Sequence, residues 1–398
     1  MDVGIDKINC YIPPYYVDLR ELARARNQEE DKFIMGIGQE RMAIAPFEQD
    51  IVAMAANAAY PIVNQEDKET IDMIIFATES SFDYSKAAAT FIHDLLSIQA
   101  FAKSFEIKQA CYSLTAAIQL AADYVRLRPD RKVLVVSADI SRYGLNTSGE
   151  VTQGAGALAM LISSQPSILK LNMESLAYTA NEYDFWRPFY RHEAIVEGKF
   201  STELYIEFFQ KLMHEFELRY ADLLQSIDAF HFHLPYSKMG CKSLKSYFKD
   251  LEKHSPLQDK ADQWQEAYQY SIMLGKQVGN IYTGSLYLSL ISSLIYNPQL
   301  KAGDSLALFS YGSGAVAEIL LGSLQAGFDQ EIDSEAILNH FDRRKKLSID
   351  EYETMYRQAI NNMEGQDIQC EQPTEPGFYL EKVENHQRIY KYQSKKNK

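Results

Sequence analysis

Runs of apolar residues alternate along this chain with segments whose apolar residues recur every three to four positions. Residues 71–78 and 227–234 are apolar at nearly every position, which is typical of strands buried on both faces. Each run follows an amphipathic segment, residues 49–59 and 203–224, whose spacing predicts a helix. Strands of this kind need helices on both sides of their sheet, so the pattern predicts an α/β protein.

The pattern also predicts a duplication. Residues 132–138 and 154–162 read as strands, and they have counterparts at residues 304–310 and 314–321. The order strand–helix–strand–helix–strand thus occurs twice, and each half ends in two neighbouring strands. Any α/β protein repeats strand–helix units, but the matched pairs of final strands favour a true duplication. We expect an N-terminal half (1–165) and a C-terminal half (166–398), with a helical appendage (331–366) and a terminal hairpin (377–392).

Composition narrows the class of protein. The chain has 398 residues, 46% hydrophobic and 24% charged, which is ordinary for a soluble globular protein. Its net charge of −14 argues against general binding to nucleic acids or anionic membranes. No secretory signal is visible, and the longest apolar run, 285–296, is too short to span a bilayer, so a cytoplasmic location is the default expectation. The four cysteines are scattered, which does not predict a zinc site or a disulfide framework.

Cys111 is the first candidate for chemistry. A strand-like run, 105–109, leads into a helical segment with one apolar face, formed by Leu114, Ala117, Ile118, Ala121 and Val125. Cys111 should therefore lie at a helix N-terminus, where unpaired N–H groups and the helix dipole favour a thiolate. We expect a lowered thiol pKa and a nucleophile able to hold an acyl group. The alternative is a small buried core cysteine.

Polar residues also follow other strands, at the sheet edge where α/β proteins bind ligands. Glu79 follows the strand 71–78 and is either a capping group or a general base. His231 and His233 point to one side of their strand, which would allow a metal pair, but no third ligand is near and an acid–base role for one of them is favoured. Asn280 and Ser313 lie in glycine-containing turns where backbone N–H groups can approach a ligand.

A row of lysines follows His233. Its members recur at the spacing of one helical face and are Lys238, Lys242, Lys245 and Lys249. In an acidic protein such a row could bind a phosphorylated ligand, or it could be an ordinary solvated helix face.

Together these segments resemble the 3-hydroxy-3-methylglutaryl-CoA synthases, in their shorter bacterial form, within the thiolase superfamily. The matching segments are residues 77–80, 109–112, 137–139, 183–188, 197–201, 232–236, 279–285 and 311–314. The stretch 104–108 departs from the family's commoner acidic-Gly-Asn pattern, while the Ala-Cys-Tyr core is intact. The resemblance implies duplicated βαβαβ halves in a layered αβαβα architecture.

The resemblance also implies an activity: condensation of acetyl-CoA with acetoacetyl-CoA, in the mevalonate route to isoprenoids. Cys111 would carry the acetyl group, Glu79 would be the general base, and His233 would assist at the acetoacetyl ketone. CoA thioesters would be substrates, with no resident cofactor or metal, and the protein would be a homodimer. The implied substrate contacts are Asn280, Ser313, Tyr143, Thr152, Ser201 and Asp184, with Lys238 and Lys242 at the CoA phosphates.

Physical chemistry is consistent with these roles. A thioester enolate carries charge on oxygen, and backbone N–H groups near Cys111 and residues 312–314 could form an oxyanion hole. Glu79 would need desolvation and a raised pKa to remove a methyl proton. Two alternatives remain: a decarboxylating β-ketoacyl synthase, which also uses Cys, His and Asn but needs no carboxylate base, and a non-catalytic CoA-binding scaffold.

Overall fold

A nine-stranded mixed sheet organises the molecule, in the order β11-β12-β13-β8-β1-β7-β6-β4-β5. The computed structural model describes residues 2–252, 255–362 and 365–394. Two half-sheets meet at the centre, where β1 (Gly4–Tyr11) pairs with β8 (Leu169–Thr179) through Gly4–Lys170 and Ile5–Leu169. The long sheet is therefore two half-sheets with a short junction.

The two half-sheets confirm the duplication. In the first half, β4 (Ile71–Ala77) is parallel to β6 (Lys132–Ile140), which is antiparallel to β7 (Ala155–Ser163). In the second half the same relations link three strands, namely β11 (Ile227–Phe232), β12 (Ser305–Gly312) and β13 (Val316–Leu324). β5 (Lys103–Ile107) extends the first half beyond β4 and has no equivalent among the described strands of the second half.

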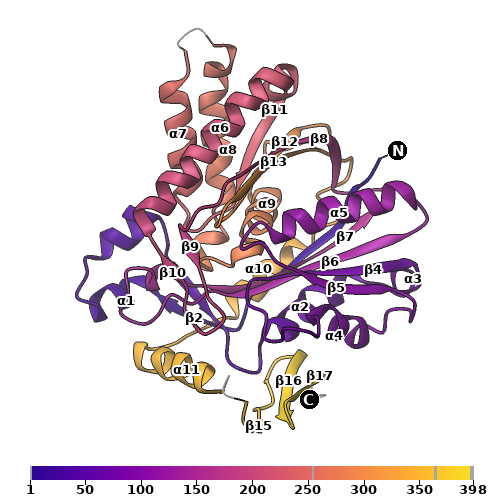
Figure 1. Ribbon diagram of the computed structural model, residues 1–398, viewed down its shortest axis with the longest axis vertical. Coiled ribbons are helices and arrows are strands. Elements are labelled where there is room, and N and C mark those ends of the chain that lie inside the picture. Colours follow the sequence, from indigo (N-terminus) through magenta and orange to yellow (C-terminus); the bar gives the residue numbers. More distant parts are fainter. Residues whose placement is uncertain (1, 253–254, 363–364, 395–398) are drawn as a thin grey trace.

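Helices lie between and outside the half-sheets, which gives the predicted layers (Figure 1). A central core contains α5 (Ser113–Leu127) and α9 (Ser285–Tyr296). A second core lies under α2 (Ile51–Ala59) and α4 (Ala88–Leu95), and a third lies under α6 (Gly198–Gln225) and α7 (Met239–Asp250). The strands are apolar at nearly every position because both of their faces are buried. In β4, Met73, Ile75 and Ala77 belong to the central core, while Ile74 and Phe76 belong to the second core.

The C-terminal part of the chain adds helices and a hairpin to the second half. The appendage contains α10 (Ser334–Asp342) and α11 (Ile349–Asn361), and the hairpin is formed by β16 (Gly377–Glu384) and β17 (Gln387–Gln393). α11 packs against α1 (Leu19–Ala25) in a fourth apolar core. None of the described helices has the length and apolar character needed to cross a membrane.

The remaining elements are short or connecting. They are β2 (Tyr15–Asp18), η1 (Lys32–Ile37), β3 (Arg41–Ile44), η2 (Tyr60–Ile62), α3 (Gln65–Thr70), η3 (Glu150–Thr152), β9 (Phe185–Trp186), β10 (Ile195–Val196), η4 (Pro256–Lys260), α8 (Ala261–Ser271), η5 (Gly275–Gln277), η6 (Tyr282–Gly284), β14 (Lys345–Lys346) and β15 (Ile368–Gln369).

Candidate active site

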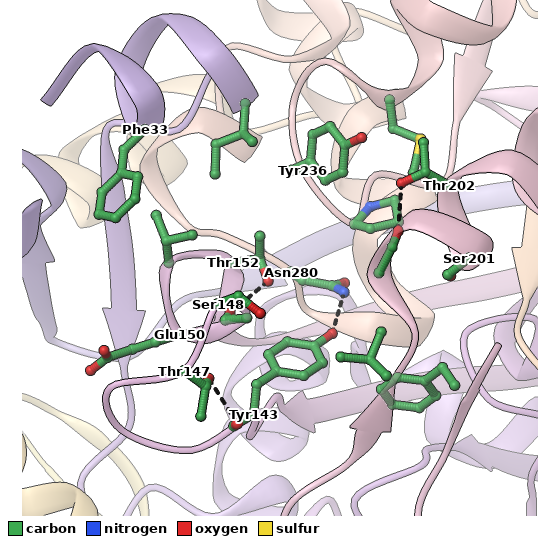
Figure 2. A pocket seen from close by; sticks show the side chains of 18 of the residues that line it. Phe33, Tyr143, Thr147, Ser148, Glu150, Thr152, Ser201, Thr202, Tyr236 and Asn280 are labelled. Carbon is green, nitrogen blue, oxygen red and sulfur yellow. Dashed lines mark hydrogen bonds between the residues drawn. The ribbon is translucent and has the colours of Figure 1, made fainter. Parts of the chain in front are cut away.

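A cavity of about 550 Å³ lies where strand ends of both halves converge. Its wall brings together seven of the residues selected from the sequence, which are Cys111, Tyr143, Thr152, Ser201, His233, Asn280 and Ser313. Figure 2 shows Tyr143 and Asn280 pointing toward each other, with Phe33 across the cavity from Tyr236 and Ser201. Residues far apart in the sequence therefore line one cavity large enough for an extended small-molecule ligand.

Cys111 is held by a tight turn between β5 and α5. Ala110 has a left-handed backbone with φ of 42°, which is uncommon for a residue with a side chain. The Ser113 hydroxyl closes the turn, because it accepts from the N–H of Gln109 at 2.5 Å and donates to the carbonyl of Ala110 at 2.9 Å. The turn places the thiol two residues before the helix, at the cavity wall.

The thiol of Cys111 and the carboxylate of Glu79 form a hydrogen-bonded pair. Cys111 Sγ donates to Glu79 Oε1 at 3.1 Å. Burial, followed by the charge of Glu79, raises the pKa of the thiol well above its ordinary value, so the expected lowering is wrong. The partial charge of a helix end is outweighed by desolvation and by a full negative charge in contact. Burial and Asp139 likewise raise the pKa of Glu79 to about 8, in the direction that desolvation predicts.

Asp139 holds Glu79 in place. One oxygen of this fully buried carboxylate accepts from the N–H of Glu79 at 3.0 Å, and the other accepts from the hydroxyl of Thr283 at 2.6 Å. The same carboxylate accepts from the hydroxyls of Thr78 and Ser80. It thereby ties the end of β4 to η6, beside Asn280. The sequence signal for Asp139 was its place at the end of the predicted strand 132–138.

The two histidines of β11 have different surroundings. His233 lines the cavity, and burial lowers its pKa to about 3, so its imidazole is neutral at physiological pH. Its carbonyl accepts from the hydroxyl of Tyr205 at 2.6 Å, which fixes the backbone after the strand. His231 is enclosed in the core with a pKa lowered to about 4. Within the described ranges, no group of three or more His, Cys, Asp or Glu side chains is arranged to hold a metal.

Asn280 is fixed by three hydrogen bonds. Its Oδ1 accepts from the N–H of Tyr282 at 2.9 Å and the hydroxyl of Ser285 at 3.1 Å, and its Nδ2 donates to the Tyr143 hydroxyl at 3.1 Å (Figure 2). Gly279, with φ of 87°, precedes it, and a Cβ there would stand 2.1 Å from the carbonyl oxygen of Gln153. Only glycine allows the two backbone segments to approach this closely. Their close approach brings Asn280 and Tyr143 to the cavity wall together.

The structure differs from the expectation for Asp184, which does not reach the cavity. Its carboxylate is fully buried behind the wall and accepts from Ser201 at 3.0 Å, Tyr311 at 2.9 Å and the N–H of Gly314 at 3.0 Å. A carboxylate with three donors supports the wall that Ser201 and Ser313 form. The three donors lie 17 to 130 residues from Asp184 in the sequence. The position of Asp184 relative to a predicted strand therefore does not indicate its supporting role.

The predicted lysines also lie outside the cavity wall. Lys238 Nζ donates to the carbonyl of Met35, and Lys242 Nζ donates to the hydroxyl of Tyr236 at 2.9 Å while lying 4.9 Å from the centre of its ring. Tyr236 does line the cavity, so Lys242 stands directly behind a wall residue.

An N-terminal segment of the wall was not predicted from the sequence. From α1 to η1, six residues line the cavity: Leu22, Arg26, Gln28, Lys32, Phe33 and Ile37. Arg26 is neutralised by Glu150 and Glu353, each at 2.8 Å. Lys32 donates to Gln28 at 2.8 Å and brings a positive charge to the wall. This segment follows no strand of the predicted sheet, and only tertiary packing places it here.

Gly312 is expected to be intolerant of substitution. A Cβ at this position would lie 2.6 Å from Tyr112 Cβ and 2.7 Å from the Gln109 carbonyl oxygen, so Gly312→Ala must displace the Cys111 turn. We expect roughly a 10- to 100-fold loss of activity, because displacements near 1 Å at a reacting group have costs of this size. Steady-state assays check this, with Gly275→Ala, where the nearest atom to the added Cβ is Leu234 Cδ1 at an ordinary contact distance of 3.8 Å, as the control. Activity close to wild type in Gly312→Ala would show that the turn adapts.

Known proteins resemble this chain in sequence and in fold. Family models described as hydroxymethylglutaryl-coenzyme A synthase N terminal and C terminal match residues 1–167 and 245–393. The hydroxymethylglutaryl-CoA synthase of Enterococcus faecalis is 50% identical over 363 residues, covering 91% of this chain and 93% of that protein. The chain belongs to the hydroxymethylglutaryl-CoA synthase family. It is accordingly an acyltransferase with a thiolase-like fold.

Solved structures of hydroxymethylglutaryl-CoA synthases superimpose over nearly the whole chain. One complexed with CoA has a TM-score of 0.93 and 42% identity, covering 99% of this chain and 100% of that chain. MvaS in complex with 3-hydroxy-3-methylglutaryl coenzyme A has a TM-score of 0.88 and 30% identity, covering 99% of both chains.

Proposed function

We propose that this chain condenses acetyl-CoA with acetoacetyl-CoA and water, giving 3-hydroxy-3-methylglutaryl-CoA and CoA through an acetyl thioester on Cys111. One observation carries the proposal. Cys111 Sγ lies 3.1 Å from a carboxylate whose pKa is raised to about 8, at the wall of a cavity that also contains His233. A nucleophile, a strong carboxylate base and a neutral hydrogen-bonding group are what the reaction requires.

Acetyl transfer comes first. The sulfur of Cys111 attacks the carbonyl carbon of acetyl-CoA, the bond from that carbon to the sulfur of CoA breaks, and the thiol proton passes to the CoA sulfur. The product is a neutral thioester. Acylation therefore removes the thiol donor from Glu79 and leaves its carboxylate facing the bound acetyl group.

Carbon–carbon bond formation follows. Glu79 removes a proton from the acetyl methyl group, and the resulting enolate attacks the ketone carbon of acetoacetyl-CoA. His233 is neutral because burial holds its pKa near 3, so it donates an N–H hydrogen bond to the developing alkoxide, and the alkoxide then takes up the proton that Glu79 removed. Water then hydrolyses the Cys111 thioester, which releases the product carboxylate and restores the thiol.

The cavity wall would hold the substrates. We assign Asn280, Tyr143, Thr152, Ser201 and Ser313 to the acyl portion, since all of them line the space beside Cys111. Asp184 acts indirectly by supporting Ser201 and the N–H of Gly314. Lys32 supplies a positive charge for CoA phosphates at the wall itself, and Lys242 supplies one behind Tyr236. Lys238 lies beyond the wall and would need to leave Met35 to take part.

The test supplies substrates for both condensing reactions. Acetyl-CoA and acetoacetyl-CoA should yield 3-hydroxy-3-methylglutaryl-CoA, detected by mass spectrometry, while malonyl-CoA should not replace acetyl-CoA. A decarboxylating β-ketoacyl synthase generates its carbanion by losing CO₂ and has no use for Glu79. Consumption of malonyl-CoA with release of CO₂ would favour that alternative, and no product from either mixture would favour a CoA-binding scaffold.

The rate should depend on pH through Glu79. A general base works only when unprotonated, and burial has raised the pKa of this carboxyl to about 8. We expect kcat to rise tenfold per pH unit below this pKa and to level off above it. Measurements of kcat from pH 6 to 9.5 check this. A flat profile across that range would exclude a raised Glu79 pKa in the acetyl-enzyme.

The assembly and cellular role are part of the same proposal. We propose a homodimer, as the thiolase superfamily suggests; β5 lies at the edge of the nine-stranded sheet, and Phe101 just before it is 90% exposed. Sedimentation of the purified protein tests this point. We place the enzyme in the cytoplasm, at the step of mevalonate synthesis that forms 3-hydroxy-3-methylglutaryl-CoA.

A further inference from the structure

Glu318 is a charged residue in the largely apolar strand β13. It lies in β13, is 4% exposed, and stands between Ala317 and Ile319 of the third core. Because side chains alternate along a strand, Glu318 faces the opposite side with Leu320, which belongs to the central core around α5. Burying a carboxylate there is costly unless strong donors compensate it. None of the catalytic steps proposed above uses it.

Two donors from α5 and the turn before it meet this carboxylate. The hydroxyl of Tyr112 donates to Glu318 Oε2 at 2.6 Å, and Gln119 Nε2 donates to Oε1 at 2.9 Å. Burial and then the charge of Glu318 raise the pKa of Tyr112 far above the physiological range, so this hydroxyl keeps its proton and acts as a donor. The bonds join the second half of the molecule to the segment of the first half that carries Cys111.

The Tyr112 bond acts beside the nucleophile. Tyr112 is the next residue after Cys111, and its backbone and Cβ pack against Gly312, where no side chain can be accommodated. The turn also contains Ala110 in a left-handed conformation, which neighbouring contacts must hold. Gln119, in contrast, lies two helical turns further along α5 and also bonds to Ser175 at 3.0 Å.

We infer that Glu318 is a positioning residue for Cys111. Through the hydroxyl of Tyr112 it fixes the turn that presents the thiol to Glu79 and to the acetyl donor. Its effect belongs to acetyl transfer onto Cys111, so the inference rests on the proposed function. It predicts that losing the Tyr112–Glu318 bond slows acetylation, while losing the Gln119–Glu318 bond costs stability alone.

The experiment measures the rate of acetyl uptake from acetyl-CoA by rapid quenching and mass spectrometry. Glu318→Met and Tyr112→Phe should each slow uptake roughly 10- to 100-fold. The double variant should be no slower than the worse single variant, because both substitutions remove the same Tyr112–Glu318 bond. Glu318→Gln keeps an oxygen that accepts from Tyr112 and should stay within about threefold of wild type. The KM for acetoacetyl-CoA should be unchanged in all three single variants.

Gln119→Met is the matched control. It removes the other hydrogen bond to the same carboxylate, together with the bond to Ser175, so it should lower Tm at least as much as Tyr112→Phe and still acetylate at nearly the wild-type rate. Wild-type acetylation rates in Tyr112→Phe, or an equal slowing in Gln119→Met, would overturn the inference. Failure of the wild-type protein to take up acetyl would instead contradict the proposed function. If Glu318→Met does not fold, Tyr112→Phe, which removes a single hydroxyl, still tests whether the Tyr112–Glu318 bond positions Cys111.

Discussion

Glu79→Gln should leave Cys111 able to take up an acetyl group and should reduce condensation roughly 10³- to 10⁴-fold, the effect of removing a well-placed general base. Acetyl uptake survives because the substitution also removes the negative charge that raises the pKa of the thiol. Condensation fails because an amide cannot accept the methyl proton. Single-turnover experiments separate the two steps by following acetyl-enzyme formation and its discharge by acetoacetyl-CoA.

A control variant and a stability measurement accompany the Glu79→Gln experiment. Glu69→Gln removes the same charge from an exposed position on α3 and should behave as wild type. Glu79 binds its proton more tightly in the folded state, with pKa raised from 4.5 to about 8, so it destabilises the fold increasingly as pH rises between those values. Glu79→Gln should therefore gain roughly 3 kcal/mol at pH 7, which lies about 2.5 units above the unfolded-state pKa, and this gain should be seen as a higher Tm. Normal condensation in Glu79→Gln would rule out the base role.

Cys111→Ala should abolish turnover, with a loss of roughly 10⁵-fold or more, because the acetyl group then has no covalent carrier. The fold should persist, since the side chain is small and the turn is closed by Ser113 and not by the thiol. Cys370 lies next to β15 and does not line the cavity, so Cys370→Ala is the control and should retain full activity. Turnover is assayed with acetyl-CoA and acetoacetyl-CoA together. Residual condensation within tenfold of wild type in Cys111→Ala would show that the acetyl group is carried elsewhere.

The sequence predicted the strands and several of the residues that line the cavity because both follow local rules. Apolar runs such as 71–78 mark buried strands, and polar residues directly after them, including Glu79 and His233, meet at one edge of the sheet. The duplication was equally visible, since each half repeats the same order of apolar segments. These features depend on periodicity within some ten residues, which a single sequence displays directly.

What the sequence did not predict depends on contacts between distant segments. The pKa of Cys111 was expected to fall because the helix end is local, but burial and Glu79, 32 residues away, raise it. Asp184 is a support behind the wall because Ser201, Tyr311 and Gly314 surround it. The wall formed by Lys32 and Phe33 comes from an irregular segment with no strand to mark it. Desolvation and packing of this kind arise only in the folded chain.

Acetyl uptake by Cys111 is the most direct test of the central claim that a thiol and a carboxylate in contact form the catalytic pair. The purified protein is incubated with acetyl-CoA between pH 6 and 9, digested and weighed by mass spectrometry. We predict one added acetyl group, on the peptide containing Cys111, which disappears when acetoacetyl-CoA is supplied. Absence of acetyl on Cys111 at every pH, or acetyl that acetoacetyl-CoA does not discharge, would contradict the account.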